Sequence, residues 1–212
     1  MTKLENLRSE FLQGKLNDNN VLKHPMDQFK LWFNEAMNAN LHEPNAMFIG
    51  TSANEQPSIR TVLLREIADD GFIFYTNYGS AKAKAIAANP NVSLLFFWAV
   101  MERQVRVQGK AEKVGKEKSE AYFQSRPKGS QIASTASMQS SELPNRATLE
   151  ERVAQLEEQF KDAENLPLPE NWGGYLVKAN YFEFWQGREK RMHDRIVFEQ
   201  KDNAWIVKRL YP

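Results

Sequence analysis

The stretch Val92-Ser-Leu-Leu-Phe-Phe-Trp-Ala-Val100, followed after two residues by Arg103-Gln-Val-Arg-Val-Gln108, decides the fold. The first part is an almost continuous apolar run, which is typical of a strand buried on both faces. The second part alternates valine with polar residues, as expected of a strand that buries only one face. Two such strands, separated by a short connection, predict an antiparallel pair at the centre of a sheet.

Three further strands are expected before this pair, at residues 46–52, 58–67 and 72–76. Turns at 54–57 and at Asp69-Asp70-Gly71 join them, and Ser80 is expected to cap a helix over 81–88. Five strands in about seventy residues predict an antiparallel barrel. A parallel sheet would need more helical crossovers than this segment can hold.

The flanking segments predict helices and the rest of the sheet. Asp27 is a suitable N-cap for an amphipathic helix over 27–40, and Thr148 with Glu151 forms a capping box for a helix up to Lys161. Another helix is expected at 116–125, and further strands at 175–178, 181–184, 196–198 and 203–210. We therefore expect a mainly β fold with flanking helices (α+β), as one domain over residues 26–212. Residues 1–25 are expected to form a mobile arm, with a short helix near Leu4 to Leu12.

Composition excludes several classes of function. The 212 residues are 42% hydrophobic and 26% charged, and 28 basic against 27 acidic residues give a formal charge of +1. A nucleic-acid-binding protein would normally show a basic excess, so the local groups of cations are expected to bind small anions. Cysteine is absent, and His24, His42 and His193 have no metal-ligand spacing. With no signal peptide and no membrane-length apolar run, the expected location is the cytoplasm, with no metal and no membrane contact.

One group of cations lies between two predicted strands, in the segment from Trp185 to Arg195. It contains Arg188, Lys190, Arg191 and Arg195, together with His193 and Trp185. Guanidinium groups bind phosphate or carboxylate in a bidentate manner, and the rings offer a stacking surface, so the segment suits a planar anion. The alternative is a solvated hairpin that carries charge for solubility.

A second anion site is suggested by Tyr122 and Arg126, which share one helix face, and by Ser130 at the end of the expected break at 126–130. Phenol, guanidinium and hydroxyl groups together could hold a phosphate. The alternative is structural: Tyr122 packs in the core, the positive charge of Arg126 interacts favourably with the dipole at the helix C-terminus, and Ser130 caps the next turn. Lys82, in the first turn of its helix, opposes the helix dipole unless an anion is bound there, and could otherwise be an exposed lysine.

The sequence has no glycine-rich phosphate loop and no nucleophile elbow, so its chemistry must come from a bound group. A set of short motifs, in order from about residue 25 to the C-terminus, resembles the pyridoxamine 5′-phosphate oxidase family. These motifs are Arg60-Thr-Val-Leu-Leu-Arg65, Phe74-Tyr-Thr-Asn77, Glu102-Arg-Gln-Val105, Tyr122-Phe-Gln-Ser-Arg-Pro127, Gln139-Ser-Ser141, Trp172-Gly-Gly174, Glu183-Phe-Trp-Gln-Gly187 and Arg191-Met-His-Asp-Arg195. Each motif is weak alone, but the ordered set is highly specific.

The resemblance implies an FMN-binding split β-barrel that acts as a homodimer, with flavin sites at the subunit interface. The implied reaction is oxidation of pyridoxamine 5′-phosphate and pyridoxine 5′-phosphate to pyridoxal 5′-phosphate, in vitamin B6 salvage and biosynthesis. O₂ is the implied acceptor and gives H₂O₂, with ammonia released from the amine substrate.

The resemblance also implies which residues form the site. The FMN contacts would be Arg60, Thr61, Val62, Leu63, Leu64, Arg65, Tyr75, Thr76, Lys82, Gln104, Gln139, Ser140, Trp185 and Arg195. The substrate contacts would be Arg65, Tyr122, Arg126, Ser130, Arg191, Met192 and His193, and of these Arg191 and His193 would be catalytic.

Two positions depart from the family pattern. Ala81 stands where the family usually has arginine, which predicts weaker FMN retention unless Lys84 or a partner-chain residue compensates. Arg65 stands where lysine is common, and because charge is kept we expect a modest shift in substrate affinity. Two other functions stay open: a split-barrel flavin oxidoreductase with a nicotinamide donor, and a non-catalytic carrier of FMN or pyridoxal phosphate. A flavin carrier would not need the second phosphate site.

Overall fold

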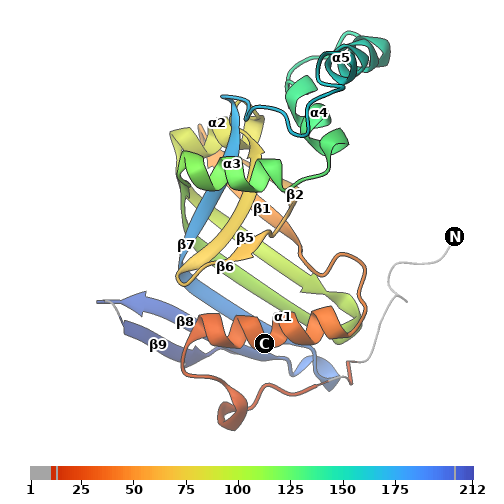
Figure 1. Cartoon of the computed structure of the whole chain (residues 1–212). Coiled ribbons are helices and arrows are strands. Elements are labelled where there is room, and N and C mark those ends of the chain that lie inside the picture. Colours follow the sequence, from red (N-terminus) through yellow and green to blue (C-terminus); the bar gives the residue numbers. More distant parts are fainter. Residues whose placement is uncertain (1–10, 13, 203) are drawn as a thin grey trace, which may run out of the picture.

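The computed structural model describes residues 11–12, 14–202 and 204–212. Their strands form one antiparallel sheet in the order β2-β1-β5-β6-β7-β4-β3, with β8 pairing β7 and β9 pairing β8. The strands are β1 (Ala46–Ala53), β2 (Gln56–Leu63), β3 (Glu66–Ile67), β4 (Gly71–Asn77), β5 (Asn91–Trp98), β6 (Arg103–Lys113), β7 (Trp172–Gln186), β8 (Asp194–Lys201) and β9 (Ala204–Arg209). The sheet curls around a core without closing, so the predicted mainly β split barrel is confirmed (Figure 1).

Five α-helices lie around this sheet in the described chain. They are α1 (Pro25–Asn38), α2 (Ala81–Ala88), α3 (Lys116–Gln124), α4 (Lys128–Ala136) and α5 (Arg146–Gln159), with short 3₁₀ turns η2 (Asp18–Asn20), η3 (Ala99–Met101) and η4 (Glu189–Arg191). Helix α1 crosses one end of the barrel, whereas α3, α4 and α5 lie at the other end (Figure 1). Two ends of the molecule are thus built from different helices.

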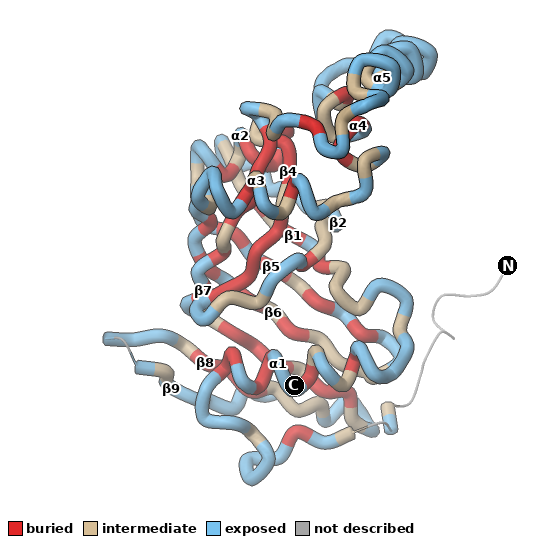
Figure 2. Tube along the Cα trace, in the orientation of Figure 1, coloured by how far each residue is buried: buried red, intermediate tan, exposed pale blue. Residues whose placement is uncertain are grey.

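The main core fills the barrel beneath α1. Phe29 of α1 is fully buried and meets Phe72 and Phe96 edge-on, at ring-centroid distances of 4.6 and 4.8 Å. A second, smaller core lies under α3 and α4, where Phe123, Ile132 and Trp172 are buried (Figure 2). Burying each large side chain contributes about 1.5–3 kcal/mol, so both cores stabilise the fold.

Two predicted helix starts are wrong by a few residues. Helix α1 begins at Pro25, with His24 as the N-cap whose Nδ1 accepts the N–H of Met26, and Asp27 lies in the first turn. Proline favours the first helical position because it lacks the N–H that would be unpaired there. Helix α5 begins at Arg146, where the side chain of Asn145 accepts the N–H of Thr148 at 2.9 Å. Thr148 is therefore inside the helix instead of capping it.

The expected burial of β5 on both faces is also wrong. Its residues alternate between buried and more exposed positions, and Phe97 is 54% exposed. One face of β5 looks into the barrel core and the other looks outward, beside exposed Ile59 and Phe48 of the neighbouring strands. A continuous apolar run therefore marks a strand with a barrel core on one side and an uncovered apolar surface on the other.

The break predicted at 126–130, after the helix at 116–125, is shorter than expected, and a helix that was not predicted follows it. Helix α4 starts at Lys128, which places Ser130 in its first turn rather than at the end of the break. The cap that Ser80 gives α2 is confirmed, since its Oγ accepts the N–H of Ala83 at 3.4 Å.

The expectation that the C-terminal strands complete the sheet is confirmed, because β7 lies between β6 and β4. Two predicted strands at 175–178 and 181–184 are one continuous strand, with a bulge opposite Gln108 and Gly109 of β6. The helix predicted near Leu4 to Leu12 falls largely outside the described residues. Among the described residues, no helix combines the length and the apolarity needed to cross a bilayer.

Candidate functional site

A cavity of about 390 Å³ lies where β2, β4, α2, α3 and α4 meet. Its walls include many of the residues expected to bind cofactor and substrate: Thr61, Val62, Leu63, Arg65, Tyr75, Thr76, Lys82, Tyr122, Arg126 and Gln139. A larger hollow of about 820 Å³ lies on the outer face of β1, β2 and β5, but no charged side chain lines it in the described chain. The smaller cavity is therefore the candidate anion site.

Lys82 lies on the wall of this cavity and is 8% exposed. Ser80 is the N-cap of α2, which begins at Ala81, so Lys82 lies in the first turn of the helix. Its side chain points toward β4. Its Nζ donates to Thr76 Oγ1 at 3.1 Å and to Gln139 Oε1 at 2.9 Å. Burial, and then the nearby Arg60, lower the pKa of Lys82 below its usual value. Both of these acceptors are neutral, so the positive charge remains available to a ligand.

Arg126 follows the end of α3 and faces the same cavity. Its Nη1 donates to Ser134 Oγ at 2.9 Å and its Nη2 to the carbonyl of Ser130 at 3.1 Å. The guanidinium also lies 5.0 Å from the ring centroid of Trp172. Burial lowers the pKa of Arg126, Tyr122 opposes that shift, and Arg65 adds to it. The charge of Arg126 is thus desolvated and repelled by another cation.

Aromatic rings form the floor of the site. Tyr75 and Tyr122 stack with centroids 3.9 Å apart and planes at 18°, and Trp172 lies parallel to both. Burial and the nearby Glu66 raise the pKa of Tyr75 to about 12, so its hydroxyl stays protonated. Parallel rings of this kind suit contact with a flat heteroaromatic ligand.

Arg60 of β2 is the fourth cation of this region, with Arg65, Lys82 and Arg126. Its Nη1 donates to Thr51 Oγ1 at 2.8 Å, its Nη2 donates to Ser58 Oγ at 2.6 Å, and burial lowers its pKa. In the described part of the chain, no carboxylate forms an ion pair with any of these four cations. Burial desolvates Arg60, Lys82 and Arg126. Desolvated cations normally have an anionic partner, so the residues present fit phosphate groups.

Four expected contacts of this region lie off the cavity wall: Arg60, Leu64, Ser130 and Ser140. Leu64 packs in the barrel core, and both its backbone polar groups bond to Asn45. Ser130 is not on the wall, and its carbonyl accepts from Arg126. Ser140, whose φ is 70°, lines a neighbouring hollow of about 210 Å³ that Gln139 shares.

The remaining expected residues form a second cluster on β6, β7 and β8. Gln104, Trp185 and Arg195 are register partners across these three strands, so their side chains lie in one row on one sheet face. The ring of His193 lies 4.7 Å from that of Trp185. Sequence positions as distant as 104 and 195 are therefore brought together, as the resemblance implies.

The loop before β8 carries Arg191, Met192 and His193. Lys190 and Arg191 have φ values of 53° and 60°, a left-handed conformation that is uncommon for residues with side chains. The backbone N–H of Arg188 donates to His193 Nδ1 at 3.1 Å, which leaves the proton of the neutral ring on Nε2. Burial, and then Arg191, lower the pKa of His193 and favour this neutral form.

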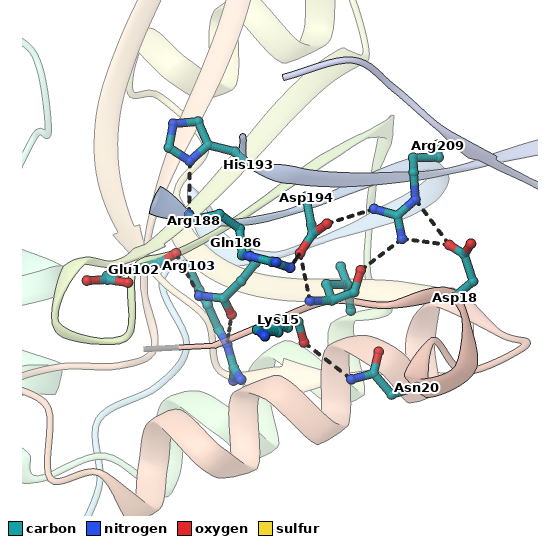
Figure 3. Close-up of polar contacts among 11 residues, drawn as sticks. Lys15, Asp18, Asn20, Glu102, Arg103, Gln186, Arg188, His193, Asp194 and Arg209 are labelled. Carbon is teal, nitrogen blue, oxygen red and sulfur yellow. Dashed lines mark hydrogen bonds and ion pairs between the residues drawn. The ribbon is translucent and has the colours of Figure 1, made fainter. Parts of the chain in front are cut away.

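Asp194 holds this loop in place and was not among the expected residues (Figure 3). Its Oδ2 accepts from Arg188 Nη1 at 2.8 Å and from the backbone N–H of Leu16 at 3.0 Å, and its Oδ1 accepts from Arg209 Nη1 at 2.8 Å. Leu16 itself is buried, so part of the expected N-terminal arm packs beside the loop. Asp194 lay within a quoted motif, but only the fold reveals its partners.

The two clusters lie at opposite ends of β7. Gly174 pairs with Tyr75 of the first cluster, and Trp185, eleven residues further along β7, belongs to the second. A strand rises about 3.3 Å per residue, so roughly 36 Å of strand separates them. Figure 1 shows the same separation, with α3 and α4 at one end of β7 and α1 and β8 at the other. One chain cannot bring both clusters to one ligand.

Comparison with known proteins identifies the family of this chain. Residues 33–160 match the family model described as pyridoxamine 5′-phosphate oxidase, and residues 172–212 match the one described as the pyridoxine 5′-phosphate oxidase C-terminal dimerisation region. Pyridoxine/pyridoxamine 5′-phosphate oxidases of Cupriavidus necator and Thermosynechococcus vestitus are 49% and 45% identical to the chain, with all of each sequence covered. The crystal structure of PhzG from Burkholderia lata has a TM-score of 0.86 at 27% identity, covering 92% of this chain and 95% of PhzG. The chain therefore belongs to the pyridoxamine 5′-phosphate oxidase family.

Proposed function

We propose that this protein is an FMN-dependent oxidase of phosphorylated B6 vitamers. Pyridoxamine 5′-phosphate, O₂ and water would give pyridoxal 5′-phosphate, ammonia and H₂O₂. Pyridoxine 5′-phosphate and O₂ would give pyridoxal 5′-phosphate and H₂O₂. The observation that carries the proposal is the cavity of about 390 Å³ whose cations lack carboxylate partners among the described residues. Two phosphorylated ligands, FMN and the vitamer, supply the missing negative charge.

The working site is proposed to lie between two copies of the chain. One subunit contributes the cavity with Lys82 and Arg126, and the other contributes the row that contains Trp185 and Arg195. The distance along β7 supports this division, because each chain holds its two clusters too far apart to share a ligand. A homodimer also gives a partner to the exposed outer face of β5, and two-fold symmetry then creates two equal sites.

Within this site, the residues divide by ligand. Lys82 and Arg60 are proposed to hold the FMN phosphate, while Arg65, Arg126 and Tyr122 hold the phosphate of the vitamer. Bound FMN supplies the redox chemistry, accepting electrons from the 4′ carbon and returning them to O₂. The protein excludes water and fixes the substrate ring, which the stacked Tyr75 and Tyr122 suit.

The loop residues are proposed to complete the site from the second subunit. Arg191 would cover and orient the substrate, and Met192, which is 67% exposed in the single chain, would lie beside it. His193 is held neutral with its proton on Nε2, so it can donate a hydrogen bond to the substrate ring. A cytoplasmic location stays a prediction from the sequence.

A peroxide assay on purified protein loaded with FMN tests this function. We expect pyridoxamine 5′-phosphate to yield equal amounts of H₂O₂, ammonia and pyridoxal 5′-phosphate, and pyridoxine 5′-phosphate to yield peroxide without ammonia. Oxidation of a nicotinamide donor with no reaction of either vitamer would instead identify a different flavin oxidoreductase. FMN binding with no turnover of any of these compounds would identify a carrier.

A further inference from the structure

Glu183 is a buried carboxylate in the middle of β7, and none of the expected site roles includes it. Its side chain is 3% exposed. Oε1 accepts from Arg195 Nε at 2.8 Å and also lies 2.8 Å from Arg195 Nη2. Oε2 accepts from Arg106 Nη1 at 2.8 Å and from the hydroxyl of Tyr181 at 3.2 Å. Both oxygens are therefore fully engaged with cationic or hydroxyl donors.

The sheet register explains how Glu183 reaches Arg195. Glu183 and Trp185 are two residues apart on β7 and share a face, and Arg195 of β8 is the register partner of Trp185. Glu183 thus contacts Arg195 diagonally, from the position next to the row that holds Gln104 and Trp185.

Two contacts fix the plane of the Arg195 guanidinium. Glu183 holds its Nε side, and Nη1 donates to the carbonyl of Tyr211 at 3.0 Å. An arginine has more N–H groups than these contacts use, so the terminal nitrogens keep donors for a ligand. The side chain of Arg195 is 27% exposed, compared with 3% for Glu183, so its outer edge reaches the surface.

We infer that Glu183 is a positioning residue for FMN, which holds the Arg195 guanidinium in the orientation that binds the flavin. This inference rests on the proposed function, because it takes Arg195 as a flavin contact. A buried ion pair is a poor source of stability, since desolvation offsets most of the attraction. Fixing the direction of an arginine that must meet an anionic, planar ligand is a better account of a carboxylate at this place.

Substitution Glu183→Gln tests the inference through FMN affinity alone. The apoprotein is titrated with FMN, and quenching of flavin fluorescence gives the Kd without any turnover. Glutamine keeps the shape but loses the charge, so one charge-assisted hydrogen bond to Arg195 is weakened. We expect the FMN Kd to rise by about tenfold.

Arg106→Met is the matched control, because it removes the other cation from the same carboxylate and leaves both Glu183–Arg195 contacts. The Arg106 side chain is 43% exposed, and we expect its loss to change the FMN Kd by less than about threefold. Equal weakening of FMN binding in Glu183→Gln and Arg106→Met would indicate a general loss of structure and overturn the inference.

The wild-type titration separates the two levels of the argument. A wild-type apoprotein that fails to bind FMN would overturn the proposed function itself. Wild-type binding together with an unchanged Kd in Glu183→Gln would overturn only the role of Glu183. If Glu183→Gln is not recovered folded, Glu183→Asp decides, because it keeps the charge but withdraws it from Arg195. A wild-type Kd in Glu183→Asp would then overturn the inference.

Discussion

Substituting Lys82 by methionine gives a sharp test of the anion site. Lys82 Nζ lies between Thr76 Oγ1 and Gln139 Oε1, and no carboxylate pairs with it among the described residues. Methionine keeps an unbranched side chain that is only one atom shorter, but it removes the charge. A hydrogen bond to a charged group is worth about 1.5–3 kcal/mol, and each 1.4 kcal/mol is tenfold. We therefore expect FMN to bind Lys82→Met roughly 10- to 150-fold more weakly.

The same substitution should leave the apoprotein nearly as stable as the wild type, because an uncompensated buried charge is lost together with its two hydrogen bonds. The sign of the pH effect follows from the lowered pKa of Lys82. The folded state binds fewer protons than the unfolded state between that lowered pKa and the ordinary value of 10.5. The wild type should therefore gain stability relative to Lys82→Met as pH rises through this window.

Fluorescence titration with FMN measures the first effect, and urea unfolding of the apoprotein at several alkaline pH values measures the second. Lys30→Met is the control, since Lys30 is an exposed residue of α1, and α1 lies at the other end of the barrel from α2 (Figure 1). An FMN Kd in Lys82→Met equal to that of Lys30→Met would refute the reasoning.

Three more predictions concern single residues. Ala81→Arg adds a cation next to the proposed site of the FMN phosphate and should tighten FMN retention; an unchanged affinity would count against the prediction that Ala81 weakens FMN binding. Arg191→Ala should lower turnover far more than FMN content, and equal loss of both would make it a flavin residue. Gly71→Ala would place a Cβ 1.9 Å from the carbonyl oxygen of Val177, so we expect a loss of about 2–4 kcal/mol in urea unfolding. Gly129→Ala, where a Cβ meets nothing within 4 Å, should not destabilise the protein, and a similar loss there would contradict the steric argument.

Much of the fold follows from local patterns. The alternation around Val105 predicts β6 correctly, because only one face of that strand enters the core. The errors in the predicted helix boundaries arise where tertiary structure, or a competing local signal, determines where a helix begins. Helix α5 is capped by Asn145 and not by Thr148, since both residue types can cap and only the backbone path selects one. Helix α4 was missed because Pro127 and Gly129 suggested a longer break.

The candidate site depended on a resemblance more than on spacing. Tyr122 and Arg126 could be paired from helical periodicity, but nothing local connects Gln104 with Arg195. Their proximity is a product of sheet register, which joins residues far apart in the chain. Glu183 and Asp194 have no role in the site predicted from the sequence, because their burial and their arginine partners depend on the fold.

The length of β7 has a consequence for mixtures of inactive proteins. If the ends of this strand serve different sites, an Arg126→Ala chain and an Arg191→Ala chain damage opposite halves. A hybrid of the two then contains one site with both defects and one with none. Co-refolding the two inactive variants should restore about one quarter of wild-type activity, since about half of the dimers are hybrids. Two inactive variants would thus recover activity on mixing, because the hybrid dimer contains one site built from two undamaged halves.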